Sequence, residues 1–251
     1  MKASEAIGDV GGWLLSPLTG ALAAVRRGRM FHPDGVVLAA EVEPRPQQIE
    51  LGELAQRLAG PALVRFSSAW WKGEKEWPDD LGLALRFRSS AEPSAEPAPG
   101  DQDLLFATIR SPWTTIAAVL TTHVHDFLAN DYYAVSPFRV RGVGTRMKWR
   151  LVSSRPETHA ATRVERLLEA VRSGGAQLRL QVKRSGMHYQ DVARVRLIEP
   201  VELDQTRLRF DPFRDGRGVV PVGLVHTLRK GAYAGSQKIR AHVHQTDQSA
   251  R

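Results

Sequence analysis

Short segments with the pattern of β-strands recur along most of the chain. In two of the clearest, residues 63–66 and 83–88, apolar and polar residues alternate, and arginine repeatedly takes the polar position. Such alternation is typical of a strand that buries one face and exposes the other. Eight segments have strand character: residues 35–42, 63–66, 83–88, 104–109, 147–152, 178–182, 192–198 and 207–210. Eight strands are enough to close a sheet, so we predict an antiparallel eight-stranded β-barrel.

Two segments between the strands have helical spacing instead. The first begins at Ser111-Pro112, a capping residue followed by proline, and has apolar residues at 113, 116, 117, 120, 124, 127 and 128. The second begins with the capping-box pair Thr162 and Glu165 and ends at the two glycines 174 and 175. Because these helices lie between groups of strands, the predicted fold class is α+β, a barrel with flanking helices.

One low-complexity segment, residues 89–100, is rich in proline, alanine, glutamate and serine. It cannot bury enough apolar surface to offset the entropy of ordering it. Because strand-like segments flank it, we interpret it as a flexible loop rather than as a linker between domains. We therefore predict a single domain over residues 1–244 and a disordered polar tail at residues 245–251.

The composition excludes several kinds of chemistry. The 251 residues include no cysteine, which excludes disulfides, thiolate metal sites, iron–sulfur clusters and a cysteine nucleophile. No apolar segment reaches the roughly 18 residues that a membrane span needs. We interpret the apolar residues 13–25 as a packed helix rather than an export signal, because Glu5 and Asp9 precede them, and we expect a cytoplasmic protein.

The net charge of +8, from 35 Lys and Arg against 27 Asp and Glu, fits either an anionic partner or a basic surface without one. The basic residues are scattered along the sequence, so we do not expect nucleic acid as the main partner. A homo-oligomer is compatible with the composition. The expected partners are small molecules.

Common hydrolase and nucleotide-binding motifs are absent from the sequence, including G-x-S-x-G, H-E-x-x-H, the phosphate-binding loop and G-x-G-x-x-G. His123 and His125 are two residues apart and would face different sides of a helix, so we do not expect them to share a metal ion. His32 directly precedes a strand. From there it can point into the mouth of a barrel and act as an acid or base, although the following Pro-Asp-Gly also fits an ordinary surface turn.

A second cluster lies near the C-terminus. Arg229, Tyr233, Ser236 and Arg240 fall on one stripe of a helix. An arginine one turn away can keep a tyrosine phenolate ionised, and a phenolate is an axial ligand for haem iron. The alternative for this segment is an ordinary basic amphipathic helix.

In their order along the chain, these clusters resemble the haem catalases and their smaller catalase-like peroxidase relatives. Residues 29–35 (R-x-x-H-x-x-G) resemble the distal-histidine segment of that family, and residues 65–67 (R-F-S) resemble a strand next to its haem. Further similar segments follow in the same order at residues 80–87, 103–110, 178–182, 210–212 and 229–236. The resemblance covers nearly the whole chain, from residue 29 to residue 240.

The resemblance implies an enzyme with haem b. It implies Tyr233 as the axial ligand of the haem iron, with Arg229 keeping the phenolate ionised. It also implies His32 as the catalytic acid and base, oriented by Ser67. The residues that would pair with the haem propionates are Arg29, Arg65 and Arg240.

The sequence departs from the family at several positions. Asp103 stands where the family has a distal asparagine, and an ionised carboxylate can only accept the hydrogen bond that an amide would donate to peroxide. The proximal aspartate–threonine pair is replaced by Gly235 and Ser236, and the chain is far shorter than a full catalase. We therefore expect a haem-dependent oxidoreductase that cleaves hydrogen peroxide or organic hydroperoxides with an unknown electron donor, more a peroxidase than an efficient catalase.

Three alternatives stay open. One is a catalytically silent relative, with or without bound haem. Another is a haem enzyme of the same fold that rearranges fatty-acid hydroperoxides and consumes no reductant. The third is a basic nucleic-acid-binding domain.

Overall fold

The structure is a computed structural model of the chain, and it describes residues 35–69, 75–110, 120–134 and 136–222. Within these residues the strands form one antiparallel sheet in the order β10-β6-β7-β5-β4-β3-β2-β1-β9-β8. The strands are β1 (Gly35–Pro44), β2 (Gly60–Ser68), β3 (Leu81–Phe87), β4 (Gln102–Ala107), β5 (Asp131–Tyr133), β6 (Phe138–Val140), β7 (Arg146–Ser153), β8 (Gln177–Arg184), β9 (Gln190–Pro200) and β10 (Val219–Pro221).

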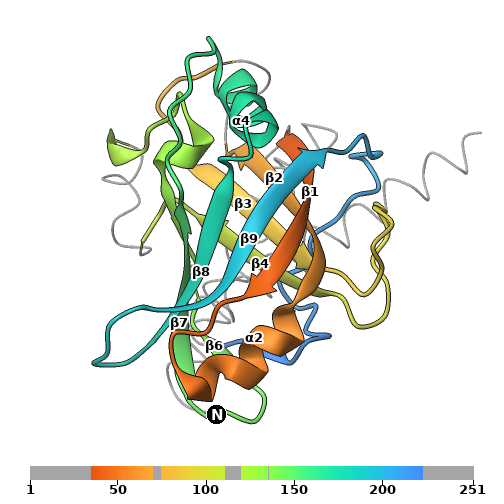
Figure 1. Ribbon diagram of the computed structural model, residues 1–251, viewed down its shortest axis with the longest axis vertical. Helices are drawn as coiled ribbons and strands as arrows, with labels where there is room; N and C mark the ends of the chain where they lie inside the picture. The colour runs from red at the N-terminus through yellow and green to blue at the C-terminus, as the bar shows by residue number, and fades with distance from the viewer. Residues whose placement is uncertain (1–34, 70–74, 111–119, 135, 223–251) are drawn as a thin grey trace, which may run out of the picture.

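A pairing between β7 and β8 closes eight of these strands into a barrel (Figure 1). The ring runs from β7 through β5, β4, β3, β2, β1, β9 and β8 back to β7. β6 and β10 form a short ribbon that continues from β7 outside this ring. The predicted closed eight-stranded antiparallel barrel is confirmed.

Seven of the eight predicted strand segments overlap strands of the ring, and the eighth does not. Residues 207–210 form no strand; instead Leu208 is buried against Val37 and Leu63 on the outside of the barrel. The backbone N–H groups of Arg207 and Leu208 donate to the carbonyl oxygen of Asp204 within a turn instead of to a neighbouring strand. The missing strand is β5, whose three residues are too few to show an alternating pattern.

The helix predicted from Thr162 is confirmed as α4 (Arg163–Arg172), which packs against β9. The Thr162 side chain accepts a hydrogen bond from the Glu165 backbone N–H, and the Glu165 carboxylate accepts one from the Thr162 backbone N–H. A short helix, α2 (Gly52–Leu58), follows the 3₁₀ turn η1 (Ile49–Leu51) and packs against β1 and β9. α2 was not predicted from the sequence, because its seven residues are too few to show helical periodicity.

The other predicted helix was expected over residues 111–128. Residues 111–119 lie outside the described part of the chain, and helical backbone is seen at residues 120 and 121. The helix does not continue to residue 128, because Asp126 accepts a hydrogen bond from the Leu128 backbone N–H at 2.7 Å and caps the 3₁₀ turn η3 (Phe127–Ala129). The expected C-terminal end of this helix was therefore wrong.

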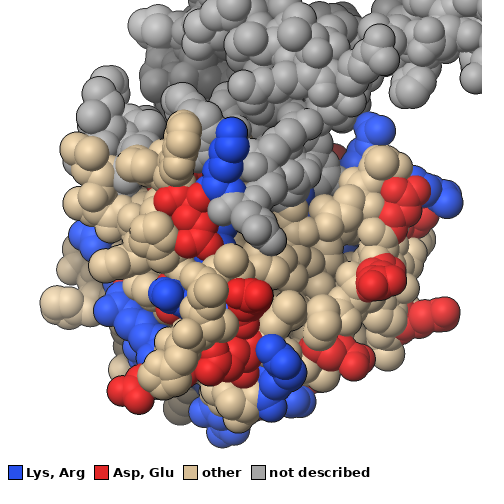
Figure 2. Space-filling view, turned by 90° about the horizontal axis from the view of Figure 1, so that it is seen from above, with Lys and Arg blue, Asp and Glu red and all other residues tan. Residues whose placement is uncertain are grey.

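Alternate residues of each strand fill the interior of the barrel. On β7, Met147, Trp149 and Leu151 are buried, while the alternating residues Arg146 and Lys148 are exposed. The face seen from above in Figure 2, which includes the end of the molecule where α4 lies, carries Lys, Arg, Asp and Glu interspersed. No helix in the described part of the chain is long and apolar enough to cross a bilayer.

Candidate functional site

A row of small residues crosses the outer face of β1, β2, β3 and β4. Gly35 lies opposite Ser67, Ser67 opposite Gly82, and Gly82 opposite Ala107. Directly opposed residues of antiparallel strands point to the same side, so these four positions share one face. With strands about 4.8 Å apart, the row spans about 14 Å. The result is a flat strip on which no side chain is larger than that of serine.

Arg65 lies in the next row of the same face, between Val37 on β1 and Ala84 on β3. It is 4% exposed, and its Nε donates a hydrogen bond to Oε1 of Gln205 at 3.3 Å. The amide of Gln205 also donates to the carbonyl oxygen of Gly35 at 2.6 Å. The segment after β9 therefore fixes a guanidinium beside the row of small residues.

Gly35 is required by its neighbours. A Cβ atom at this position would lie 2.5 Å from the carbonyl oxygen of Phe66 and 2.7 Å from Cζ of Arg65. Real Cβ atoms do not come this close to backbone oxygen, so the backbone of β2 would have to move. The glycine thus allows β1 to approach β2 closely at the end of the row.

The structure brings together two of the site residues predicted from sequence. Arg65 and Ser67 alternate along β2 and point to the same outer face, where Ser67 belongs to the row of small residues. Both side chains are 4% exposed. The other residues assigned to the haem site lie outside the described residues; they are Arg29, His32, Arg229, Tyr233 and Arg240.

Asp103 was expected in the distal site beside His32. In the structure its carboxylate is bound by two arginines and a backbone N–H group. It lies on the outer face of β4, four residues or about 13 Å along the strand from Ala107. Its carboxylate is 0% exposed and accepts hydrogen bonds from Arg86 Nε at 2.8 Å and Arg86 Nη2 at 3.1 Å. The second oxygen also accepts from Arg214 and from the backbone N–H of Asp211 at 2.8 Å.

This buried ion pair holds the segment that follows β9 against the barrel. Arg86 also donates to the carbonyl oxygens of Ala95 and Arg209, and its guanidinium carbon lies 4.8 Å from the centre of the Phe210 ring. With both of its oxygens occupied in this way, Asp103 is an anchor between segments of the chain. Its predicted place in the distal site beside His32 stays a prediction, because His32 lies outside the described residues.

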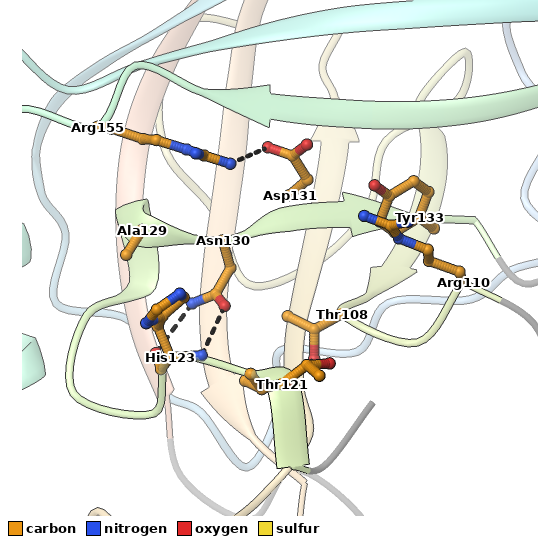
Figure 3. A pocket seen from close by; sticks show the side chains of 10 residues that line it. Thr108, Arg110, Thr121, His123, Ala129, Asn130, Asp131, Tyr133 and Arg155 are labelled. Atoms are coloured by element: carbon orange, nitrogen blue, oxygen red, sulfur yellow. Dashed lines mark hydrogen bonds and ion pairs between the residues drawn. The ribbon is translucent and has the colours of Figure 1, made fainter. Parts of the chain in front are cut away.

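A cavity of about 440 Å³ opens where the row of small residues ends (Figure 3). Thr108, which follows Ala107 at the end of β4, is one of its walls. The Asn130 amide holds the opposite wall in place, with hydrogen bonds to the backbone N–H and carbonyl oxygen of His123 at 2.9 Å each. The residues that line the cavity are Thr108, Arg110, Thr121, Thr122, His123, Ala129, Asn130, Asp131, Tyr133 and Arg155.

The cavity wall is linked to a buried carboxyl group. Asp80 accepts a hydrogen bond from the Thr108 hydroxyl at 2.6 Å, and that hydroxyl lies 2.8 Å from the hydroxyl of Thr122. Burial raises the pKa of Asp80 to about 6, the Thr108 hydrogen bond opposes this rise, and the nearby Asp79 adds to it. A carboxyl group with such a pKa can hold or release a proton near neutral pH.

Nothing in the sequence pointed to this cavity or to the part of Asp80 in it. The lining residues come from four separate segments and Asp80 from a fifth, so no local motif connects them. The signal that was available is the pair of adjacent acids, Asp79 and Asp80, directly before a buried strand. In the described residues there is no group of three or more His, Asp or Glu placed to hold a metal ion.

Comparisons with known proteins connect this barrel to one enzyme class by its fold alone. No family model matches the sequence, and no curated protein matches it. Among solved structures, a fungal catalase is similar with a TM-score of 0.60 and 12% sequence identity over 89% of this chain. The chain spans 62% of the length of that catalase. The fold of this protein is therefore catalase-like.

Proposed function

We propose that the protein is a haem-dependent oxidoreductase that cleaves hydrogen peroxide or organic hydroperoxides, acting more as a peroxidase than as an efficient catalase. The observation that carries this proposal is the flat row of small residues next to Arg65 and Ser67 on a catalase-like barrel. A haem site needs a flat wall for the macrocycle and cationic partners for the propionates.

The residues of the row fit the shape and charge of haem. A planar macrocycle needs a wall from which no side chain projects, and the positions Gly35, Ser67, Gly82 and Ala107 supply one. Its two propionates need cations, because charge-assisted hydrogen bonds to a guanidinium are the strong ones. Arg65, held next to the row by Gln205, is placed to serve one of them.

The remaining contacts are assigned from the sequence. Tyr233 would hold the iron as a phenolate, and Arg229 would keep that phenolate ionised. Arg29 and Arg240 would pair with the propionates together with Arg65. When bound, ferric haem supplies an iron centre at which the O–O bond of a hydroperoxide can be cleaved.

The proton chemistry falls to His32. It would take the proton from the incoming hydroperoxide and return it to the oxygen that leaves. Ser67 would orient the imidazole by a hydrogen bond. An electron donor of unknown identity completes the reaction of a peroxidase.

The first test is a titration of the purified full chain with haemin, followed by absorption in the Soret region. We expect a saturable spectral shift at one haem per chain. Tyr233→Phe should weaken haem binding by about tenfold or more, because the anionic ligand is lost. The matched control is Tyr189→Phe, on the loop between β8 and β9, which should bind haemin as the wild type does. A wild-type Soret band in Tyr233→Phe would refute the axial ligand.

A second variant tests the row of small residues independently of the axial ligand Tyr233. Ala107→Leu places a branched side chain in the row of small residues and should prevent haemin from binding while the fold, followed by circular dichroism, is kept. Ala39→Leu makes the same change on the same outer face of β1, away from the row, and is the control. Equal haemin affinity in the two variants would show that the row is not the haem wall.

The third variant concerns catalysis. His32→Ala should keep the Soret band and lose its reaction with hydrogen peroxide, whereas His188→Ala, at an exposed position, should keep both. A protein that gives no saturable shift with haemin would be the silent relative, and the proposed activity would be abandoned.

A further inference from the structure

Two neighbouring segments of the barrel contain Lys and Arg but no Asp or Glu. Residues 138–153, which form β6, β7 and their connection, contain five Lys and Arg and no Asp or Glu. Residues 177–189, which form β8 and the loop after it, contain three Lys and Arg and again no acid. The other 27 Lys and Arg of the chain are balanced by its 27 Asp and Glu. Together these two segments, which are neighbours in the sheet, carry eight Lys and Arg and no acid.

The fold turns these cations to one side. β6, β7 and β8 are neighbours in the sheet, and the interior positions of β7 are taken by Met147, Trp149 and Leu151. The residues between them project outward, at intervals of about 6.7 Å along the strand. We call this surface the basic face, and its members are Arg139, Arg146, Lys148, Arg150, Arg179 and Lys183.

Like charges oppose each other directly on the basic face. Arg139 lies opposite Arg146, and Lys148 lies opposite Lys183. Directly opposed like charges destabilise a sheet. None of these four side chains forms an ion pair with an acid of the described residues. The protein thus keeps an arrangement that stability alone disfavours.

The neighbouring strand shows the contrast. On β9, Arg194 and Arg196 lie 3.9 and 3.5 Å from the carboxylate of Glu43, so each has an acid nearby within the sheet. Arg179, at the border of the basic face, is likewise paired with Asp191 at 3.5 Å. On β6, β7 and the adjoining part of β8, by contrast, Arg139, Arg146, Lys148 and Lys183 have no ion pair with an acid of the described residues.

An aromatic ring is built into the basic face. Tyr189 lies on the loop after β8, with the guanidinium carbon of Arg150 4.1 Å and the Lys183 ammonium 5.1 Å from its ring centre. Arg150 is itself fixed by a hydrogen bond from its Nε to Gln181 at 2.7 Å. Cations that follow a backbone, combined with aromatic rings, are how proteins bind single-stranded nucleic acids.

We propose that the basic face binds single-stranded nucleic acid. A straight row of cations along a strand matches a linear chain of phosphates. An anionic membrane is the less suitable occupant, because peripheral binding also needs apolar side chains to insert. Met187, 45% exposed, is the one exposed large apolar residue in the described part of this region. From the sequence, nucleic acid was kept only as an alternative, since the basic residues are scattered along the chain and meet only in the folded barrel.

The test is fluorescence anisotropy of the full chain with a labelled oligo(dT) and a labelled oligo(rU) of about 20 nucleotides, in a salt series from about 50 mM NaCl upward. We expect the wild type to bind with a steep salt dependence. The variant Arg146→Gln/Lys148→Gln/Lys183→Gln should lose about tenfold or more in affinity, and its slope of log K against log salt should fall by about 2. Its Tm should equal or exceed that of the wild type, because opposed cations have been removed.

The matched control removes three charges elsewhere. Arg172, Arg207 and Arg209 are exposed and lie on α4 and on the segment after β9 rather than on the basic face, and Arg172→Gln/Arg207→Gln/Arg209→Gln should change the affinity by less than about twofold. Tyr189→Ala should weaken binding and leave the salt slope unchanged, because stacking involves no phosphate.

Three results would overturn the proposal. The first is no binding of either oligonucleotide by the wild type at the lowest salt. The second is an equal loss of affinity in the two triple variants, which would show a diffuse charge effect. The third is binding to vesicles of phosphatidylcholine and phosphatidylserine without binding to oligonucleotides, which would identify a membrane surface instead.

Discussion

Replacing Asp80 by asparagine tests the buried carboxyl group beside the cavity. Burial raises the pKa of Asp80 from 3.8 to about 6 in the folded protein. Between these two values the folded state keeps a proton that the unfolded chain has released. The stability contributed by the protonated group is therefore complete below about pH 4 and is lost as the pH rises through about 6.

The size of the effect follows from the two pKa values. Their difference corresponds to about 3 kcal/mol of unfolding free energy. Asparagine has nearly the same shape, keeps an oxygen that can accept the Thr108 hydrogen bond, and does not titrate. Relative to wild type, Asp80→Asn should therefore gain about 3 kcal/mol of stability between pH 4 and about pH 7.5.

The assay is urea unfolding of both proteins at several pH values, followed by circular dichroism. Asp204→Asn is the matched control, because Asp204 is exposed and the Thr206 hydroxyl and backbone N–H lower its pKa. The stability that Asp204 contributes is present above its unfolded pKa and lost as the pH falls, so the difference between this variant and wild type should move in the opposite direction. A difference between Asp80→Asn and wild type that does not change with pH would refute the reasoning.

Three further predictions concern stability. Asp103→Leu leaves the fully buried guanidinium of Arg86 without its carboxylate and should cost about 3–5 kcal/mol in urea unfolding, while Arg86→Met/Asp103→Leu should recover much of that loss; a double variant as unstable as the single one would contradict this. Thr162→Ala removes the cap of α4 and should cost about 1 kcal/mol in the same assay, and an unchanged midpoint would speak against the cap. Gly35→Val brings a Cβ within 2.5 Å of the Phe66 carbonyl oxygen and should cost about 1–3 kcal/mol by calorimetry, which an unaltered Tm would disprove.

The barrel could be predicted from the sequence because apolar and polar residues alternate along its strands according to which side chains are buried. The alternation along residues 83–88 reflects Leu83, Leu85 and Phe87 pointing into the core. The start of α4 was predicted from the capping-box pair Thr162 and Glu165. These signals are local. The strand β5 and the helix α2 are too short to carry one, and their positions are set by tertiary packing.

Only part of the candidate site could be predicted from the sequence, because only residues close together in the sequence form a recognisable motif. Arg65 and Ser67 were assigned from the resemblance of residues 65–67 to a strand of the catalase family, and they lie on one face because they alternate along β2. The role of Asp103 depends on Arg86, Asp211 and Arg214, which are separated from it by 17 to 111 positions. Asp80 and Thr108, which link the buried carboxyl group to the cavity, are 28 positions apart, so no motif near Asp80 indicates their hydrogen bond.

Ring closure in this barrel has a consequence for how the chain folds. β1 pairs with β9 as well as with β2, and the residues joined by the β1–β9 pairing, from Pro44 with Ala193 to Leu38 with Pro200, are 149 to 162 positions apart. A nascent chain can form the β2–β3–β4 meander early, but the first strand keeps one edge without its partner until β9 has been synthesised. Contacts of such long range are entropically costly to form and slow folding. During synthesis the exposed edge of β1 is therefore where this protein is most open to mispairing with another chain.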